Sequence, residues 1–188
     1  MAWSLNPFAA LLPWRRHDPH AAEIYGAIVA QARLPVFYHG FGVPDTLEGR
    51  FVVLSLHLFA VLHRLKAGGA QALPMAQQLA DRFTADMETV LRELGVGDLK
   101  IPKKVRGLAA SGAALLGDYE EAIGRGEGAL AATIAGALPL EEKCANAAAA
   151  RLTPYLTKMI RYLETQPLQD LCAGTLTFPE PRAAQEGR

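Results

Sequence analysis

The sequence predicts an all-α fold, a single compact bundle of about six helices. The 188 residues are enough for one domain with one core, and the 51% hydrophobic content is too high for a disordered chain. Apolar residues recur at helical spacing in several segments, and no segment alternates as a half-buried strand does. Around a helical domain at residues 19–172, we expect a short N-terminal arm (1–18) and a flexible, extended C-terminal tail (173–188).

The first helix is expected from Pro19 to about Arg33. Asp18 can accept hydrogen bonds from the free N–H groups of the first turn, and proline at the first helical position loses no backbone bond. The apolar side chains that repeat at helical spacing are Ile24, Tyr25, Ala27, Ile28 and Ala32.

A loop follows at residues 34–45, where two prolines and two glycines prevent a long regular element. This loop carries three aromatic residues, Phe37, Tyr38 and Phe41, so we expect it to pack onto the domain. Thr46 can then cap a second helix that ends after Lys66, at two glycines. Because this second helix is apolar around most of its circumference, it should be the central helix of the fold.

Four further helices are expected at residues 73–94, 98–123, 129–138 and 140–165, with glycines between several of them. Pro154 lies inside the last of these and removes one backbone hydrogen bond, so this helix should either bend or split. Residues 167–172 can add one more helical turn before the tail.

Composition and charge restrict the partners and the compartment. The 19 Lys and Arg residues equal the 19 Asp and Glu residues, so no overall positive field favours DNA, and we expect no DNA partner. Two cysteines outside any C-x-x-C pair indicate neither a zinc site nor a disulfide framework. The longest apolar stretch, residues 51–62, is shorter than the roughly 20 residues of a membrane helix, and the N-terminus does not have the order of an export signal. We expect a soluble cytoplasmic protein that can also lie peripherally on the inner face of the cytoplasmic membrane.

No motif for catalysis is recognisable. The chain lacks G-x-S-x-G, a phosphate-binding loop with Lys and Ser/Thr, H-E-x-x-H, and a G-x-G-x-x-G between strand and helix. We therefore expect a protein that is not an enzyme, with no catalytic residue, no metal ligand and no cofactor.

Arg50, His57 and Arg64 lie seven residues apart on the second helix, so they form one narrow stripe. In one interpretation the stripe faces water. In the other, Arg50 and His57 are partly enclosed and paired with Asp86 or another carboxylate, because an unpaired buried guanidinium is very costly. Such a pairing would either fix the positions of the helices or line a polar groove, and the stripe is a candidate partner-binding site.

A basic cluster stands at the start of the fourth helix: Lys100, Lys103, Lys104 and Arg106. Positive charge at a helix N-terminus opposes the helix dipole, so helix stability does not account for it. The cluster is either a solvated run of charge or a contact for an acidic surface, such as ribosomal RNA, anionic lipid headgroups or an acidic partner protein.

An ordered series of short segments runs through residues 21–124. They are 25–33 (Tyr-Gly-Ala-Ile-Val-Ala-Gln-Ala-Arg), Pro35, Phe37-Tyr38, 42–46 (Gly-Val-Pro-Asp-Thr), Gly49-Arg50-Phe51, Leu56-His57, Phe83, Asp86-Met87 and 91–99 (Leu-Arg-Glu-Leu-Gly-Val-Gly-Asp-Leu). Taken together, this series resembles the ubiquinol-cytochrome c chaperone family. Residues 111–117 depart from the family pattern, which has bulky aromatics and Gly-Arg ahead of Tyr119, and the resemblance stops near residue 124.

The resemblance implies an assembly chaperone of the respiratory chain. Mitochondrial members work with a partner chaperone at the ribosomal exit tunnel and hold newly made cytochrome b until it enters the cytochrome bc complex. This chain looks like a bacterial member, so the expected partners are cytochrome b or another bc-complex subunit, together with the ribosome or the inner-membrane surface. The alternative is a helical carrier of a lipid, a quinone or haem, which would need a closed apolar cavity.

Overall fold

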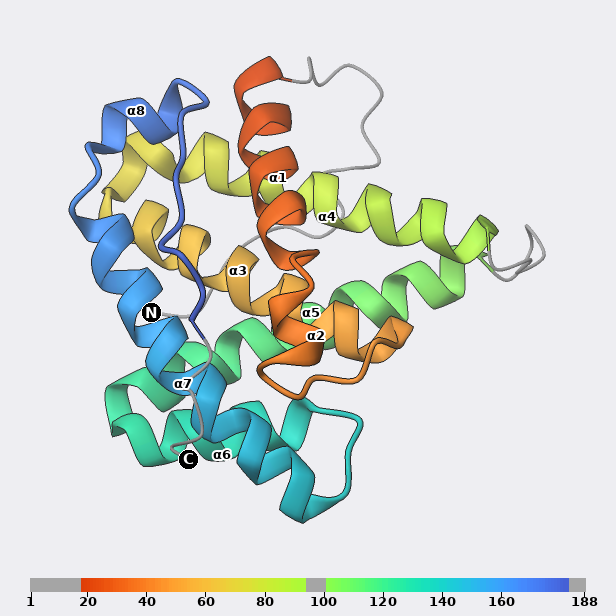
Figure 1. The fold of residues 1–188 in the computed structure, drawn as a ribbon. Coiled ribbons are helices and arrows are strands. Elements are labelled where there is room, and N and C mark those ends of the chain that lie inside the picture. The colour runs from red at the N-terminus through yellow and green to blue at the C-terminus, as the bar shows by residue number, and fades with distance from the viewer. Residues whose placement is uncertain (1–17, 94–100, 183–188) are drawn as a thin grey trace.

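The computed structural model describes residues 18–93 and 101–182, without the side chains at a few positions near the start of α5. Six helices of 11 to 25 residues form the bundle of Figure 1, which confirms the all-α class: α1 (Pro19–Ala32), α3 (Leu47–Ala67), α4 (Leu73–Glu93), α5 (Ile101–Arg125), α6 (Glu127–Ala137) and α7 (Glu142–Glu164). Short helical pieces lie between and after them: α2 (Val36–His39), η2 (Gly69–Ala72) and α8 (Leu168–Cys172).

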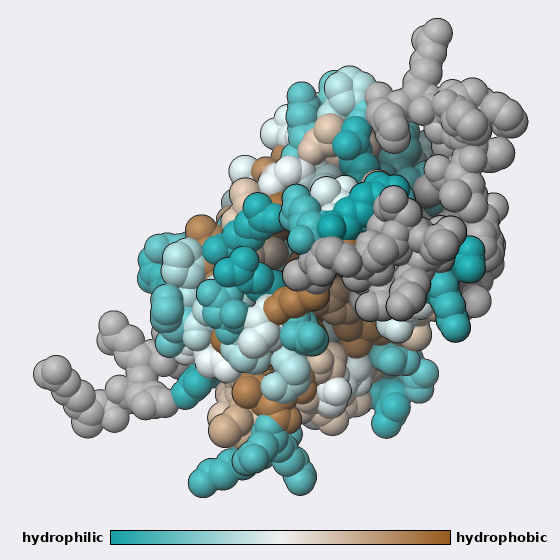
Figure 2. Space-filling view, turned by 90° about the vertical axis from the view of Figure 1, so that its right-hand side faces the viewer, coloured by the Kyte–Doolittle hydropathy of each residue, from teal (hydrophilic) through white to brown (hydrophobic). Residues whose placement is uncertain are grey.

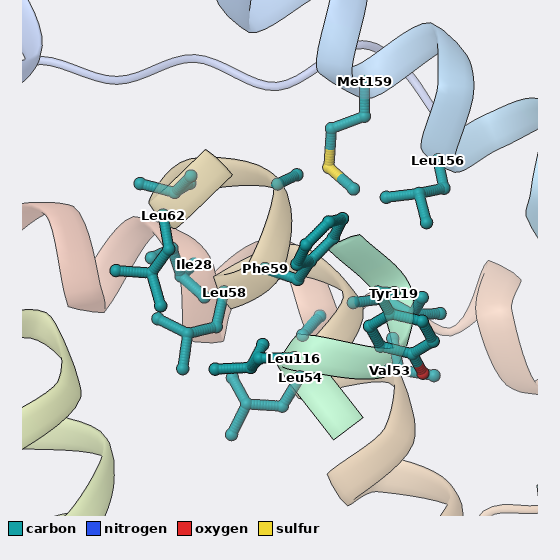
Figure 3. Packing of buried hydrophobic residues seen from close by; sticks show 14 of the residues in the cluster. Ile28, Val53, Leu54, Leu58, Phe59, Leu62, Leu116, Tyr119, Leu156 and Met159 are labelled. Atoms are coloured by element: carbon teal, nitrogen blue, oxygen red, sulfur yellow. The ribbon is translucent and has the colours of Figure 1, made fainter. Parts of the chain in front are cut away.

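Helix α3 is the centre of the core, as its apolar circumference predicts. It packs against α1, α4, α5 and α7, and every residue from Val52 to Leu62 is buried. Figure 3 shows Phe59 of α3 facing Met159 and Leu156 of α7, with Tyr119 of α5 beside them. A helix that is apolar on most sides is stable only when other helices cover it, so α3 determines where its neighbours must lie.

The predicted helix starts are formed as the sequence indicates. The Asp18 carboxylate accepts a hydrogen bond from the His20 N–H at 2.9 Å, and the Thr46 hydroxyl accepts one from the Gly49 N–H at 3.2 Å. Gly49 is also required sterically, because a Cβ atom there would collide with the Pro44 carbonyl. The turn before α3 therefore lies directly against the first turn of that helix.

The aromatic loop packs onto the domain, as expected. Phe37 and Phe41 are buried, and the Tyr38 hydroxyl donates to the Ala32 carbonyl at 2.8 Å. The short helix α2 within this loop was not predicted. Because α2 spans only Val36–His39, it has no repeating apolar pattern by which sequence could identify it.

Helix α7 continues through Pro154 without a break, so the split considered from the sequence does not occur. Pro154 is exposed, and so is Ala150, whose carbonyl would otherwise accept the hydrogen bond that proline cannot donate. Water can solvate that carbonyl, which keeps the cost of the missing bond low.

The C-terminal tail is extended as far as the structure describes it. Residues 175–182 have no helix, and Figure 1 shows this dark-blue segment running from α8 between α1 and α7. Phe178 packs against the core and Pro179 is buried. The flexibility of residues 173–188 and the domain boundaries stay predictions. Within the described ranges, no helix has the length and apolar character that a bilayer span requires.

Candidate functional site

His57 lies at the polar centre of the core. Its side chain projects from the middle of α3, and the residue is 1% exposed. The ring Nδ1 lies 2.8 Å from the Val53 carbonyl oxygen, one turn earlier on the same helix, and Nε2 lies 3.1 Å from the Tyr155 hydroxyl on α7. Both ring nitrogens therefore have partners inside the protein.

These partners define the hydrogen-bond direction. A carbonyl only accepts, so Nδ1 of His57 carries the proton and Nε2 accepts from the Tyr155 hydroxyl. The same hydroxyl accepts a bond from Gln31 Nε2 of α1 at 3.0 Å. The chain of bonds from Gln31 through Tyr155 to His57 ties α1, α7 and α3 together around a neutral imidazole.

Burial controls the titration of this centre. Desolvation lowers the pKa of His57 to about 4, opposed by the bond to Val53. Desolvation likewise raises the pKa of Tyr155 to about 12. At neutral pH both groups are uncharged, so they act as a structural tie and carry no charge that could attract a partner.

Aromatic rings enclose the tie. The Phe37 ring lies edge-on to the rings of His57 and Tyr155, with centroids at 5.1 Å and 5.2 Å. Phe41 contacts Tyr155 at 5.7 Å, and Phe178 of the tail contacts His57 at 5.6 Å. Edge-to-face pairs at these separations add packing energy beyond area burial.

The predicted stripe is not one surface. Arg50, at the first turn of α3, is exposed and pairs with Asp45 at 2.6 Å, while His57 is enclosed. Arg64 is half-buried and donates to the carbonyls of Leu163 and Gln166 at the end of α7, at 3.1 Å and 3.0 Å. The interpretation in which the whole stripe faces water is wrong, because His57 is enclosed. His57 and Arg64 instead join α3 to α7, as expected if the stripe fixes the positions of the helices.

The expected carboxylate partner is found for Arg50, but it is not Asp86, and His57 pairs with a carbonyl and a hydroxyl instead. Asp86, half-buried on α4, accepts a hydrogen bond from the Tyr25 hydroxyl of α1 at 3.0 Å. Desolvation, aided by the Asp86 charge, raises the pKa of Tyr25. Arg50 does have a carboxylate partner, but it is Asp45, five residues earlier, and this exposed pair contributes little to stability.

The basic cluster is described only in part. Lys103 and Arg106 are exposed on the first turns of α5. Lys100 lies outside the described residues, and so does the side chain of Lys104. The two described side chains are open to solvent, as either interpretation of the cluster requires.

Sequence reasoning missed a second polar group between α3 and α5. Glu120 accepts from Lys66 Nζ at 2.7 Å and lies 2.9 Å from Nδ1 of His63. Burial raises the pKa of Glu120, but the bonds from Lys66 and His63 outweigh this and lower it. His63 and Lys66 lie three residues apart on one helix, which indicated a shared face but not the carboxylate that they bind.

Most of the polar side chains described above thus form bonds that join one helix to another. In the part of the chain that the structure describes, no group of three or more His, Cys, Asp or Glu side chains is placed to hold a metal ion. Tyr155, Gln31 and Glu120 lie far in sequence from the groups they bind, so only the fold reveals them.

Comparison with known proteins identifies the family. The ubiquinol-cytochrome C chaperone family matches residues 39–178, which extends past the point near residue 124 where the sequence resemblance was expected to end. The chain is 25% identical over 152 residues to ubiquinol-cytochrome-c reductase complex assembly factor 1 of Xenopus laevis, covering 80% of this chain and 76% of the relative. The crystal structure of the Cbp3 homolog from Brucella abortus matches with a TM-score of 0.76 and 34% identity, over 87% of this chain and 91% of that one.

Residues 39–178 include α3 to α8, the buried His57–Tyr155 tie and the tail as far as Phe178. The family match therefore covers both the centre of the core and the segment that closes over it. This chain belongs to the ubiquinol-cytochrome c chaperone family, whose members are assembly factors of the cytochrome bc complex.

Proposed function

We propose that this chain is a non-enzymatic chaperone that binds newly made cytochrome b, or another bc-complex component, through its helical surface and holds it for assembly. The observation that carries the proposal is the family match over residues 39–178. The relative from Xenopus laevis, named as an assembly factor of the ubiquinol-cytochrome-c reductase complex, supports the same role.

The surface offers apolar contact points at helix ends. Leu34 follows α1, Leu47 opens α3 and Leu73 opens α4, and these residues are 36%, 46% and 55% exposed. Figure 2 shows one face on which apolar residues reach the surface between polar ones. Exposed apolar side chains with polar neighbours are typical of binding surfaces, because their burial on binding supplies affinity.

Exposed positive charges can orient a partner as it approaches the chain. Arg50 is exposed near Leu47, and Lys103 and Arg106 are exposed at the start of α5. We propose that these cations, with Lys100 and Lys104, attract an acidic partner surface: the client, the ribosome or the inner face of the membrane. Such charges mainly raise the association rate and orient the partner, so added salt should weaken binding.

The deciding experiment is recovery of partners from solubilised membranes with a tagged chain. We expect cytochrome b or another bc-complex subunit, and deletion of the gene should lower the amount of assembled bc complex. Absence of every bc-complex subunit, together with normal assembly in the deletion strain, would contradict the proposal. Native mass spectrometry that found one lipid, quinone or haem per chain would instead favour the carrier.

A further inference from the structure

The described part of the tail is held like a bound peptide. We call residues 175–182 the C-terminal strap. The side-chain amide of Gln166 donates from Nε2 to the Thr177 carbonyl at 2.9 Å, and its Oε1 accepts from the Thr177 N–H at 3.0 Å. One glutamine thus pairs with both backbone groups of a strap residue, as a neighbouring strand would.

Further contacts hold the strap along its length. Leu176 and Phe178 pack against the core, the Thr175 N–H donates to the Asp170 carbonyl at 2.8 Å, and the Thr177 hydroxyl lies 3.3 Å from that of Tyr162. The Phe178 ring meets the His57 ring edge-on at 5.6 Å, and Pro179 is buried. Gln31 Nε2, which also donates to Tyr155, lies 3.4 Å from the Pro179 carbonyl. Thr175, Thr177, Glu180 and Arg182 are exposed on the outer side.

Exposed bonds and a short apolar stretch hold the strap. Both Gln166–Thr177 bonds are exposed, and exposed backbone bonds are typical of segments that open locally, while Leu176, Phe178 and Pro179 supply the apolar contact. A turn at Gly174, with φ of +90°, separates the strap from α8. Because the strap follows the last described helix, its release would leave the contacts between the helices in place.

We propose that the strap occupies, in cis, a binding site for an extended segment of the client, with an aromatic side chain in the seat of Phe178. This inference rests on the proposed chaperone function. The seat recognises a peptide backbone through Gln166 and Gln31 and one ring through His57, and none of these contacts depends on the identity of the exposed strap residues. Backbone pairing with one side-chain pocket is a general mode of peptide recognition.

Tethering makes the strap a competitor that a client must displace. An intramolecular segment acts at an effective concentration of order millimolar, so weak free peptides cannot replace it. A client segment whose neighbouring regions also bind the chaperone gains the same advantage. The strap would then cover the aromatic pocket until a client arrives.

The test uses a labelled peptide with the sequence of residues 173–182 and the full chain carrying Thr177→Pro. Proline deletes the N–H that donates to Gln166, together with the hydroxyl that contacts Gln166 and Tyr162, but keeps the residues of Phe178 and the helices unchanged. The matched control is Glu180→Ala, on the exposed side of the strap. By fluorescence anisotropy, we expect Thr177→Pro to bind the peptide at least tenfold more tightly than the parent chain and Glu180→Ala to match the parent. A peptide with alanine in place of the phenylalanine should bind at least tenfold less tightly.

Two kinds of result in this experiment would overturn the proposal. A Thr177→Pro chain that keeps its helical circular dichroism but does not bind the peptide, or binds the alanine peptide equally well, overturns the proposal. A Thr177→Pro chain that unfolds overturns it too, because the strap would then be part of the core.

A second experiment tests whether the client uses the site that the strap occupies. Thr177→Pro should recover at least threefold more bc-complex subunit from solubilised membranes than the parent chain. Equal recovery by both forms would overturn the strap proposal alone, whereas recovery by neither would overturn the chaperone function.

Discussion

Nε2 of His57 on α3 lies 3.1 Å from the hydroxyl of Tyr155 on α7, across 98 residues of sequence. Both residues are buried, and Gln31 of α1 donates to the same hydroxyl. The bond therefore joins three helices at one point inside an apolar core, where an unmet polar group is costly.

Replacing Tyr155 with phenylalanine should lower the free energy of unfolding by about 1–3 kcal/mol, because Nε2 of His57 loses its buried donor. Urea denaturation monitored by circular dichroism measures this. Tyr162→Phe is the matched control: its hydroxyl is 3.3 Å from Thr177 Oγ1 at an exposed position, and the change should stay within about 0.5 kcal/mol. Equal effects of the two variants would show that the tie does not stabilise the bundle.

The buried imidazole should make stability depend on pH. The pKa of His57 is about 4 in the folded chain and 6.5 as its ordinary value, so between these values the unfolded chain binds more protons. The contribution of His57 is thus fully present above pH 6.5 and is lost progressively as the pH falls towards 4, by about 3 kcal/mol. His57→Gln cannot titrate, so its unfolding free energy should fall less over this range. A parallel fall in both chains would contradict the assignment.

His57→Ala tests both stability and client binding. Loss of a buried ring and two hydrogen bonds should lower the free energy of unfolding by about 2–4 kcal/mol. Because the proposed client site places an aromatic ring against His57, recovery of bc-complex subunits at a temperature where the variant is folded should also fall. Unchanged recovery by the folded variant would show that the role of His57 is purely internal.

Gly49→Ala should destabilise the chain by about 1–3 kcal/mol, because the added methyl group meets the Pro44 carbonyl. Gly26→Ala is the control: this exposed position in α1 has nothing within 4 Å of the added group, and alanine should stabilise the helix by about 1 kcal/mol. Thermal unfolding of the two variants should therefore shift in opposite directions. A shift of Gly49→Ala to higher temperature would rule out the close approach.

Charge reversal tests the basic cluster. Lys103→Glu with Arg106→Glu changes two exposed residues of α5, and we expect at least threefold lower recovery of bc-complex subunits, or weaker binding to anionic vesicles, at low salt. The control, Lys143→Glu with Lys158→Glu, makes the same change in net charge at exposed positions on α7. Adding Lys104→Glu should increase the loss. If both double variants behave as the parent, the cluster is only solvated charge.

Much of the local structure follows from the sequence because it depends on neighbouring residues. The starts of α1 and α3 are set by Asp18 with Pro19 and by Thr46, and the apolar circumference of α3 requires burial on most sides. The short helix α2 and the continuity of α7 through Pro154 were missed or left open. In both cases packing and solvent exposure, rather than local propensity, decide the outcome.

The sequence by itself determined the helices, the central place of α3 and the family resemblance, because periodicity, caps and ordered motifs are written in adjacent residues. Only the tertiary structure decided that Arg50 is exposed, His57 is enclosed and Arg64 binds the end of α7. Seven-residue spacing places all three on one side of a helix, but the neighbours that cross that side determine which position meets water. Tyr155 reaches His57 only because α7 packs across α3, and no local pattern in the sequence encodes that packing.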